Sequence, residues 1–172
     1  GEHQSEGFKK LNPNGKLPVL VDGDLVLFES VAICHYLVEK YPEKKMMPVE
    51  PIFRAQAYQW IMFCATELES ALWRIDRHTF IYPEEKRLAA DIELAKEDYL
   101  RGARVLDSHM EGREFVAGDS FSVADVVLGY VIFWSEWEKL LEETPHLKAY
   151  RARLLGRPAL PEMLRTPPLE SH

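Results

Sequence analysis

Two short apolar runs separated by a tight turn constrain the fold of this 172-residue chain most strongly. The run 17–21 is followed by Asp22-Gly23-Asp24, which is a hairpin turn signal, and the second run covers 25–28. Such a short connection allows only antiparallel pairing. Because a two-stranded sheet is marginally stable by itself, we expect the hairpin to belong to a larger α/β unit.

A helix is predicted directly after the hairpin, beginning at Glu29-Ser30 and ending before Pro42. Residues 41–51 carry three prolines, and we interpret them as a linker. The chain beyond is expected to be helical at about 52–78, from Pro83 to about Met110, from Ser122 to about Leu141, and from Pro145 onward. The Ser122 segment is apolar on nearly all sides, which is typical of a buried central helix.

Composition excludes several classes of partner. Hydrophobic residues make up 47% of the chain and charged residues 28%, both ordinary for a globular protein, and the net charge is −7. An acidic chain is a poor match for nucleic acid or an anionic membrane, and no apolar run approaches the ~20 residues of a membrane span. Cys34 and Cys64 lie inside helical patterns, so the sequence favours a reduced, cytoplasmic setting.

The Leu17-Pro18 step is the first candidate binding element. A cis bond there would turn the chain and expose the backbone of Leu17, whose N–H and C=O could then pair with an extended peptide ligand. An ordinary trans proline at a strand edge is the alternative interpretation.

The start of the predicted helix is the second candidate binding element. The N–H groups of its first turn have no internal partners and can bind a carboxylate. Glu29, next to them, can accept from an ammonium group, so the pair Glu29-Ser30 matches an α-amino acid head group. Plain helix capping by Ser30 is the alternative.

These motifs occur together in a pattern that resembles the glutathione S-transferases. The quoted stretches are Asn12-Pro13-Asn14-Gly15-Lys16-Leu17-Pro18-Val19-Leu20, Leu27-Phe28-Glu29-Ser30-Val31-Ala32-Ile33 and Phe121-Ser122-Val123-Ala124-Asp125. The resemblance covers nearly the whole chain and is nearest to the phi and theta classes and their bacterial relatives.

The resemblance implies a two-part fold. Residues 1–41 would be the C-terminal part of a thioredoxin-like, α/β glutathione-binding domain, with 42–51 as the linker. Residues 52–172 would form an all-α helical bundle that lines the electrophile pocket. The family's first domain begins with a strand–helix–strand unit that this sequence lacks, so the catalytic Ser, Tyr or Cys is expected upstream of Gly1.

The resemblance also assigns glutathione-binding roles. Leu17, before a cis Pro18, is expected to pair its backbone with the cysteinyl part of glutathione. Glu29 and Ser30 are expected to hold the γ-glutamyl head group.

The remaining expected contacts involve the other end of glutathione. His3 and Lys16 are expected to lie near the glycyl carboxylate, a suitable position for a donor and a fixed cation. Gln4 is included in the binding set and stands where phi-class relatives often have Lys. Val31 stands where that class often has Arg.

Other residues carry structural interpretations. Ser122 and Asp125 have capping-box spacing at the start of a helix. The histidines show no metal-ligand spacing, and no metal is expected. A buried structural thiol is the preferred interpretation of Cys34.

The resemblance implies a homodimeric glutathione transferase that conjugates the glutathione thiolate, as co-substrate, to a small apolar electrophile in detoxification. A glutathione-dependent peroxidase or disulfide reductase on the same scaffold is the second hypothesis. A non-catalytic dimerisation module is the third.

Overall fold

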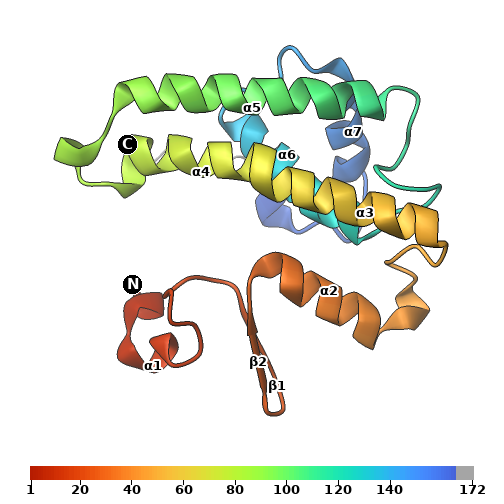
Figure 1. Ribbon diagram of the computed structural model, residues 1–172, viewed down its shortest axis with the longest axis horizontal. Coiled ribbons are helices and arrows are strands. Elements are labelled where there is room, and N and C mark those ends of the chain that lie inside the picture. The colour runs from red at the N-terminus through yellow and green to blue at the C-terminus, as the bar shows by residue number, and fades with distance from the viewer. Residues whose placement is uncertain (166–172) are drawn as a thin grey trace.

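The computed structural model describes residues 1–165 as a small α/β layer packed against a bundle of helices (Figure 1). A short helical turn, Glu2–Gln4, and α1 (Glu6–Lys9) precede β1 (Val19–Asp22) and β2 (Leu25–Phe28). The two strands pair antiparallel, so the predicted hairpin is confirmed. The first strand starts later than the apolar run, because Pro18 has no N–H to donate to the ladder.

Helix α2 (Ser30–Lys40) follows the hairpin and is tied to its turn. The Tyr36 hydroxyl donates to Asp22 Oδ2 at 2.7 Å, and the Lys40 ammonium pairs with the same carboxylate. Asp22 therefore fixes the angle between the hairpin and the helix that begins the candidate site.

The helical bundle begins with one long helical run, composed of α3 (Pro51–Phe63), π-helical turns at Cys64–Glu69, α4 (Ser70–Asp76) and further π-helical turns at Arg77–Ile81. Helix α5 (Ala89–Met110) lies alongside it, with α6 (Val123–Trp137) and α7 (Pro145–Leu155) behind (Figure 1).

The start of α5 differs from the prediction, which began this helix at Pro83. The Leu88 N–H donates to His78 Nδ1 at 3.1 Å, and the Arg87 guanidinium donates to the carbonyls of Phe80 and Tyr82. Residues Glu84–Lys86 form a short 3-10 helix, and these bonds turn the chain after it, so α5 begins at Ala89.

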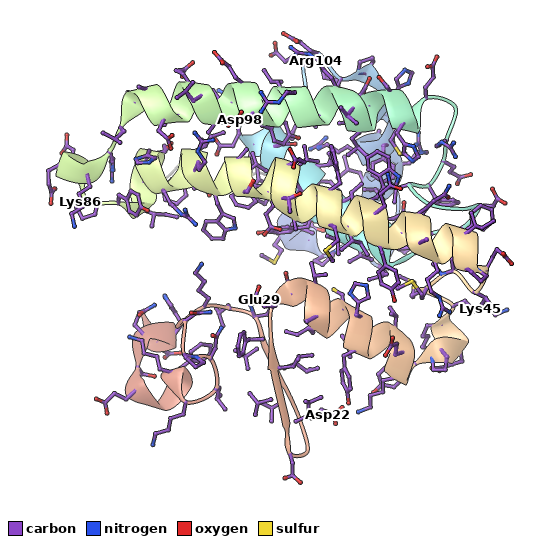
Figure 2. All side chains as sticks on the ribbon, in the orientation of Figure 1. Asp22, Glu29, Lys45, Lys86, Asp98 and Arg104 are labelled. Atoms are coloured by element: carbon purple, nitrogen blue, oxygen red, sulfur yellow. The ribbon has the colours of Figure 1, made fainter. Side chains whose placement is uncertain are left out.

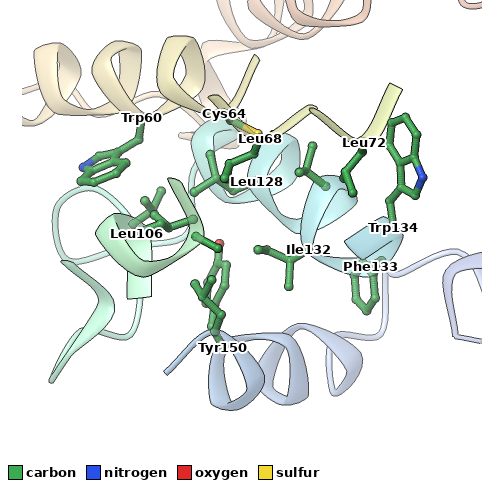
Figure 3. Packing of buried hydrophobic residues seen from close by; sticks show 14 of the residues in the cluster. Trp60, Cys64, Leu68, Leu72, Leu106, Leu128, Ile132, Phe133, Trp134 and Tyr150 are labelled. Carbon is green, nitrogen blue, oxygen red and sulfur yellow. The ribbon is translucent and has the colours of Figure 1, made fainter. Parts of the chain in front are cut away.

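Helix α6 is the centre of the bundle, as predicted. Its Leu128 and Ile132 side chains are fully buried among residues of the neighbouring helices, including Leu68, Leu106 and Tyr150 (Figure 3).

The predicted capping box at the start of α6 is confirmed. Asp125 accepts from the Ser122 N–H at 2.9 Å, from the Val116 N–H at 2.9 Å and from the Tyr150 hydroxyl at 2.8 Å. The Asp125 carboxylate therefore joins the start of α6 to α7 and to the loop that precedes α6.

The α/β layer and its following loop contact the bundle through hydrogen bonds and through ring packing. The Val123 N–H donates to the Met46 carbonyl at 2.7 Å, and the rings of His35 and Tyr58 stack with centroids 5.1 Å apart. Within residues 1–165, no helix is both long enough and apolar enough to cross a lipid bilayer.

Candidate functional site

The register of the hairpin brings the two candidate binding elements together. Val19 pairs with Phe28, so Leu17-Pro18 and Glu29-Ser30 are the residues just beyond the last pair of the ladder. The Leu17–Pro18 bond is cis, as the resemblance implied. Leu17 is 71% exposed, and its backbone has no hydrogen bond within residues 1–165. An extended ligand can therefore reach both its N–H and its carbonyl.

Glu29 has an uncommon backbone conformation at the start of α2. Its φ of 73° lies in the left-handed region, which costs a residue other than glycine about 1 kcal/mol or more. Its side chain makes no capping hydrogen bond and is exposed at the end of α2 that faces the helical bundle (Figure 2). A strained, unpaired carboxylate is suited to accepting a bond from a ligand.

Ser30 does not have the N-cap role that was the alternative interpretation of the sequence. The residue at the N-cap position is Glu29, and Ser30 is the first residue of α2, because the left-handed turn occurs one residue earlier. Within the described residues, the Ser30 hydroxyl and the backbone N–H groups of Ser30 and Val31 have no partners. They can all donate to an anion at the helix N-terminus.

The three polar residues expected near the glycyl carboxylate are held by the loop around Gly15. Gln4 Nε2 donates to the Gly15 carbonyl at 2.9 Å, and Asn12 Nδ2 donates to the Lys16 carbonyl at 2.7 Å. A Cβ at Gly15, whose φ is +59°, would meet Gln4 Nε2 at 3.0 Å, so the close approach requires glycine. His3 is half-buried beside this loop, and Lys16 is exposed.

Lys16 also connects the α/β layer to the bundle. Its ammonium lies 5.6 Å from the centroid of the Trp73 ring, on α4. The Trp73 ring packs edge-on against Trp134 of α6 at 5.2 Å, and Trp134 lies 6.1 Å from Tyr130. An aromatic surface therefore adjoins the loop that carries Lys16.

Carboxyl groups accompany these rings on both helices. We call the set the acidic aromatic wall, and its members are Glu69, Trp73, Asp76, Tyr130, Trp134 and Glu138. On each helix the members are three or four residues apart, so they share one face. This spacing is the signal by which each half could have been found in the sequence.

The pKa values of the wall reflect burial and mutual repulsion. Burial raises the pKa of Asp76 to about 7; the charge of Glu138 adds to this rise, and a hydrogen bond from Trp134 opposes it. Burial also raises the pKa of Glu69, with the nearby charge of Glu29 contributing and a bond from Trp73 opposing. Glu69 therefore links the wall electrostatically to the candidate head-group site.

Tyr130 also lines an apolar cavity of about 450 Å³. The cavity lies between α6, the end of α7 and residues 159–164, with Phe121, Phe133 and Leu160 among its lining side chains. Apolar surface is thus available beside the wall.

Within residues 1–165, the cysteines and histidines do not form a second cluster. Burial raises the pKa of both the Cys34 and Cys64 thiols, which makes them weak nucleophiles. Cys34 is half-buried rather than fully buried. Residues 1–165 contain no cluster of His, Cys, Asp and Glu that could hold a metal ion.

Family models match both parts of the chain. The model described as glutathione S-transferase, N-terminal domain, matches residues 1–39, and the model described as glutathione S-transferase, C-terminal domain, matches residues 57–158.

Individual relatives agree with these matches. A glutathione S-transferase of Hyoscyamus muticus is 30% identical over 168 residues, which cover 92% of this chain and 78% of that protein. Glutathione S-transferase GstA of Escherichia coli O157:H7 is 31% identical over 157 residues, which cover 90% of this chain and 75% of that protein.

The fold is likewise similar to solved structures. The theta class glutathione S-transferase of Xanthomonas axonopodis pv. citri, solved with glutathione bound, superposes with a TM-score of 0.77. The two sequences are 31% identical, and the match covers 92% of this chain and 76% of that one.

Proposed function

Because the chain belongs to the glutathione S-transferase family, we propose that it binds glutathione along Leu17-Pro18 and Glu29-Ser30 and transfers the thiolate to an apolar electrophile. The observation that carries this proposal is that, within residues 1–165, an unpaired Leu17 backbone lies beside an unpaired carboxylate and a free helix N-terminus. A γ-glutamyl peptide can use all three.

Each part of the tripeptide has a complementary group. The α-ammonium of the γ-glutamyl residue pairs with the Glu29 carboxylate, and its α-carboxylate accepts from Ser30 and the first-turn N–H groups. The cysteinyl backbone pairs with Leu17 in the manner of strand addition.

The glycyl end is recognised through charge. Its carboxylate lies near the Lys16 ammonium and the His3 ring, with the Gln4 amide in the same loop. Gln4 already donates to Gly15, so we expect it to act mainly by fixing the loop.

The reaction follows from thiol chemistry. A donor aimed at the glutathione sulfur lowers its pKa, and the resulting thiolate attacks the electrophile and displaces its leaving group. The identity of that donor stays the prediction made from the sequence: a Ser, Tyr or Cys. The acidic aromatic wall and the adjoining cavity offer the electrophile an apolar surface.

The cellular role and assembly are extensions of the same proposal. We expect a cytoplasmic, homodimeric detoxification enzyme with two-fold symmetry and no metal requirement. Sedimentation at micromolar concentration should give twice the mass of the chain; a monomer that binds glutathione normally would contradict the dimer and leave the binding site unaffected.

Product analysis tests the transferase against the other two hypotheses. With glutathione and an activated aryl halide, the protein should produce one thioether and one halide ion for each glutathione consumed. With an organic hydroperoxide, a peroxidase would instead convert two glutathione molecules into the disulfide. A protein that accelerates neither reaction yet binds glutathione would support the non-catalytic module and overturn the transferase.

A further inference from the structure

An unpaired buried acceptor lies in the acidic aromatic wall. Asp76 is 8% exposed, and its Oδ1 atom has no hydrogen-bond partner within the described residues. The Trp134 indole hydrogen-bonds to the same carboxyl group. A buried polar atom without a partner costs free energy, so a group that pairs with Oδ1 would be stabilised there. A ligand that donates to Oδ1 would supply that partner.

Asp76 shares its surroundings with a second carboxyl group and a tyrosine. Glu69 lies seven residues before Asp76 on the same face of the helical run, and its Oε1 atom accepts from Trp73 Nε1 at 3.4 Å. Burial raises the pKa of Tyr130, and the charges of both Glu69 and Asp76 raise it further. Both carboxyl groups therefore act on the space beside Tyr130, where their combined field attracts positive charge.

The aromatic rings of the wall favour the same kind of ligand. A cation is attracted to the face of an aromatic ring, most strongly to tryptophan. The Trp73 ring already has the Lys16 ammonium 5.6 Å from its centroid, although Lys16 belongs to the other layer of the molecule. Tyr130 is 48% exposed and Trp73 36%, so parts of both rings stay accessible.

Two lysine ammonium groups act on members of the wall. Lys16 lies over Trp73, and Lys96 of α5 lowers the pKa of Glu138, against the larger effect of burial. The Lys96 ammonium also pairs with Glu93 at 2.9 Å, and Glu29 adds a further negative charge near Glu69. An anionic group brought to Asp76 would meet repulsion, whereas a cation would find both a charge partner and ring faces.

We propose that the acidic aromatic wall binds the positively charged end of an apolar organic cation, an aryl- or alkylammonium compound, with Asp76 and Glu69 as its charge partners. Electrophiles that carry such a group are consequently preferred over neutral and anionic ones. This preference among electrophiles rests on the proposed transferase function; the binding of the cation does not.

Three probes of similar size test the charge preference. Benzylammonium, its uncharged carbon isostere ethylbenzene and the anion phenylmethanesulfonate are titrated into the protein at physiological salt and pH 8, above the pKa of about 7 of Asp76. The indole N–H signals of Trp73 and Trp134 in ¹H–¹⁵N spectra report binding, with the buried Trp60 as a reference. We expect the cation to bind at least about ten-fold more tightly than either other probe. Equal affinities for all three would overturn the proposal.

Charge-neutralising variants test the residues. Asp76→Asn and Glu69→Gln keep the side-chain shapes, and each should weaken the cation about five-fold while changing the affinity of the neutral probe little. Glu97→Gln, at an exposed position on α5, is the matched control and should bind as the wild type does. If Asp76→Asn fails to fold, Glu69→Gln decides; wild-type affinity in the folded variants would overturn the assignment.

A glutathione titration of the same variants separates this inference from the proposed function. Asp76→Asn should bind glutathione as the wild type does, because the head-group contacts lie on Glu29 and Ser30. Failure of the wild type to bind glutathione would contradict the proposed function and leave the cation preference standing. Normal glutathione binding without any cation preference would overturn the inference about the wall and leave the proposed function standing.

Discussion

At the scale of single residues, Glu29 combines a strained backbone with an unused side chain. Its φ of 73° would suit glycine better, and its carboxylate has no partner within residues 1–165. Backbone strain of this kind is found mostly at active sites and ligand-binding sites. Stability and binding should therefore respond to substitution of Glu29 in opposite directions.

Replacement of Glu29 by glycine tests this opposition. Relief of the left-handed strain outweighs the added entropy of the unfolded chain, so Glu29→Gly should raise the free energy of unfolding by about 1 kcal/mol. The same variant should lose glutathione affinity, because the partner of the ligand ammonium is removed. Urea denaturation and calorimetric titration measure the two effects. Destabilisation with unchanged binding would show that Glu29 is a structural residue.

Asp76 is the second residue that is proposed to bind a ligand at a cost to the stability of the folded protein. Its folded pKa of about 7 is above the ordinary value near 3.8, so the folded state holds a proton that the unfolded state has already lost between those pH values. The stability of the wild type is therefore reduced as pH rises from about 4 to 7.

Asp76→Asn removes this pH dependence. The variant should gain stability relative to the wild type between pH 5 and pH 8, by on the order of 2 kcal/mol. Differences in unfolding free energy at the two pH values provide the measurement, and Glu97→Gln is the control. A variant whose advantage is the same at both pH values would contradict the raised pKa.

At the scale of elements, the hairpin, α2 and the buried α6 could be predicted because local signals specify them. The Asp22-Gly23-Asp24 turn and the Ser122–Asp125 capping box act within a few residues. The start of α5 could not be predicted from Pro83, because the loop there is closed by bonds to His78, Phe80 and Tyr82 on the preceding helical run.

The capping box at α6 also carries a stability prediction. Asp125→Ala would leave the buried Val116 N–H, Ser122 N–H and Tyr150 hydroxyl without their acceptor, at a cost of about 3 kcal/mol or more. Chemical denaturation measures the loss. Asp119→Ala, at an exposed position in the same loop, should change stability by less than about 0.5 kcal/mol. Similar effects of the two substitutions would contradict the structural role of Asp125.

At the scale of the whole molecule, the candidate site depends on contacts that no local pattern specifies. The motif Leu17-Pro18 with Glu29-Ser30 could be recognised in the sequence because one hairpin joins its halves. The complete acidic aromatic wall could not be recognised in the sequence, although Trp73 and Trp134 each have suitably spaced carboxyl neighbours. Its assembly requires that α4 and α6 face each other and that Lys16 reach Trp73 from the other layer.

Lys16 links the two layers and should affect two ligands in opposite ways. Lys16→Ala removes a cation from the glycyl end of the glutathione site, so glutathione should bind about five-fold more weakly. The same change frees the face of Trp73, so benzylammonium should bind more tightly. Parallel titrations measure both affinities, with Lys10→Ala as an exposed control. Equal changes of the same sign for both ligands would contradict the bridging role of Lys16.

The central claim is that Glu29 and Ser30 hold the γ-glutamyl head group of glutathione. Calorimetric titration of glutathione into the wild type, Glu29→Ala and the exposed control Glu39→Ala of the same helix tests it most directly. We predict an affinity loss of at least about ten-fold for Glu29→Ala, as expected for removal of a charge-assisted contact, and none for Glu39→Ala. Unchanged glutathione affinity in folded Glu29→Ala would contradict the account.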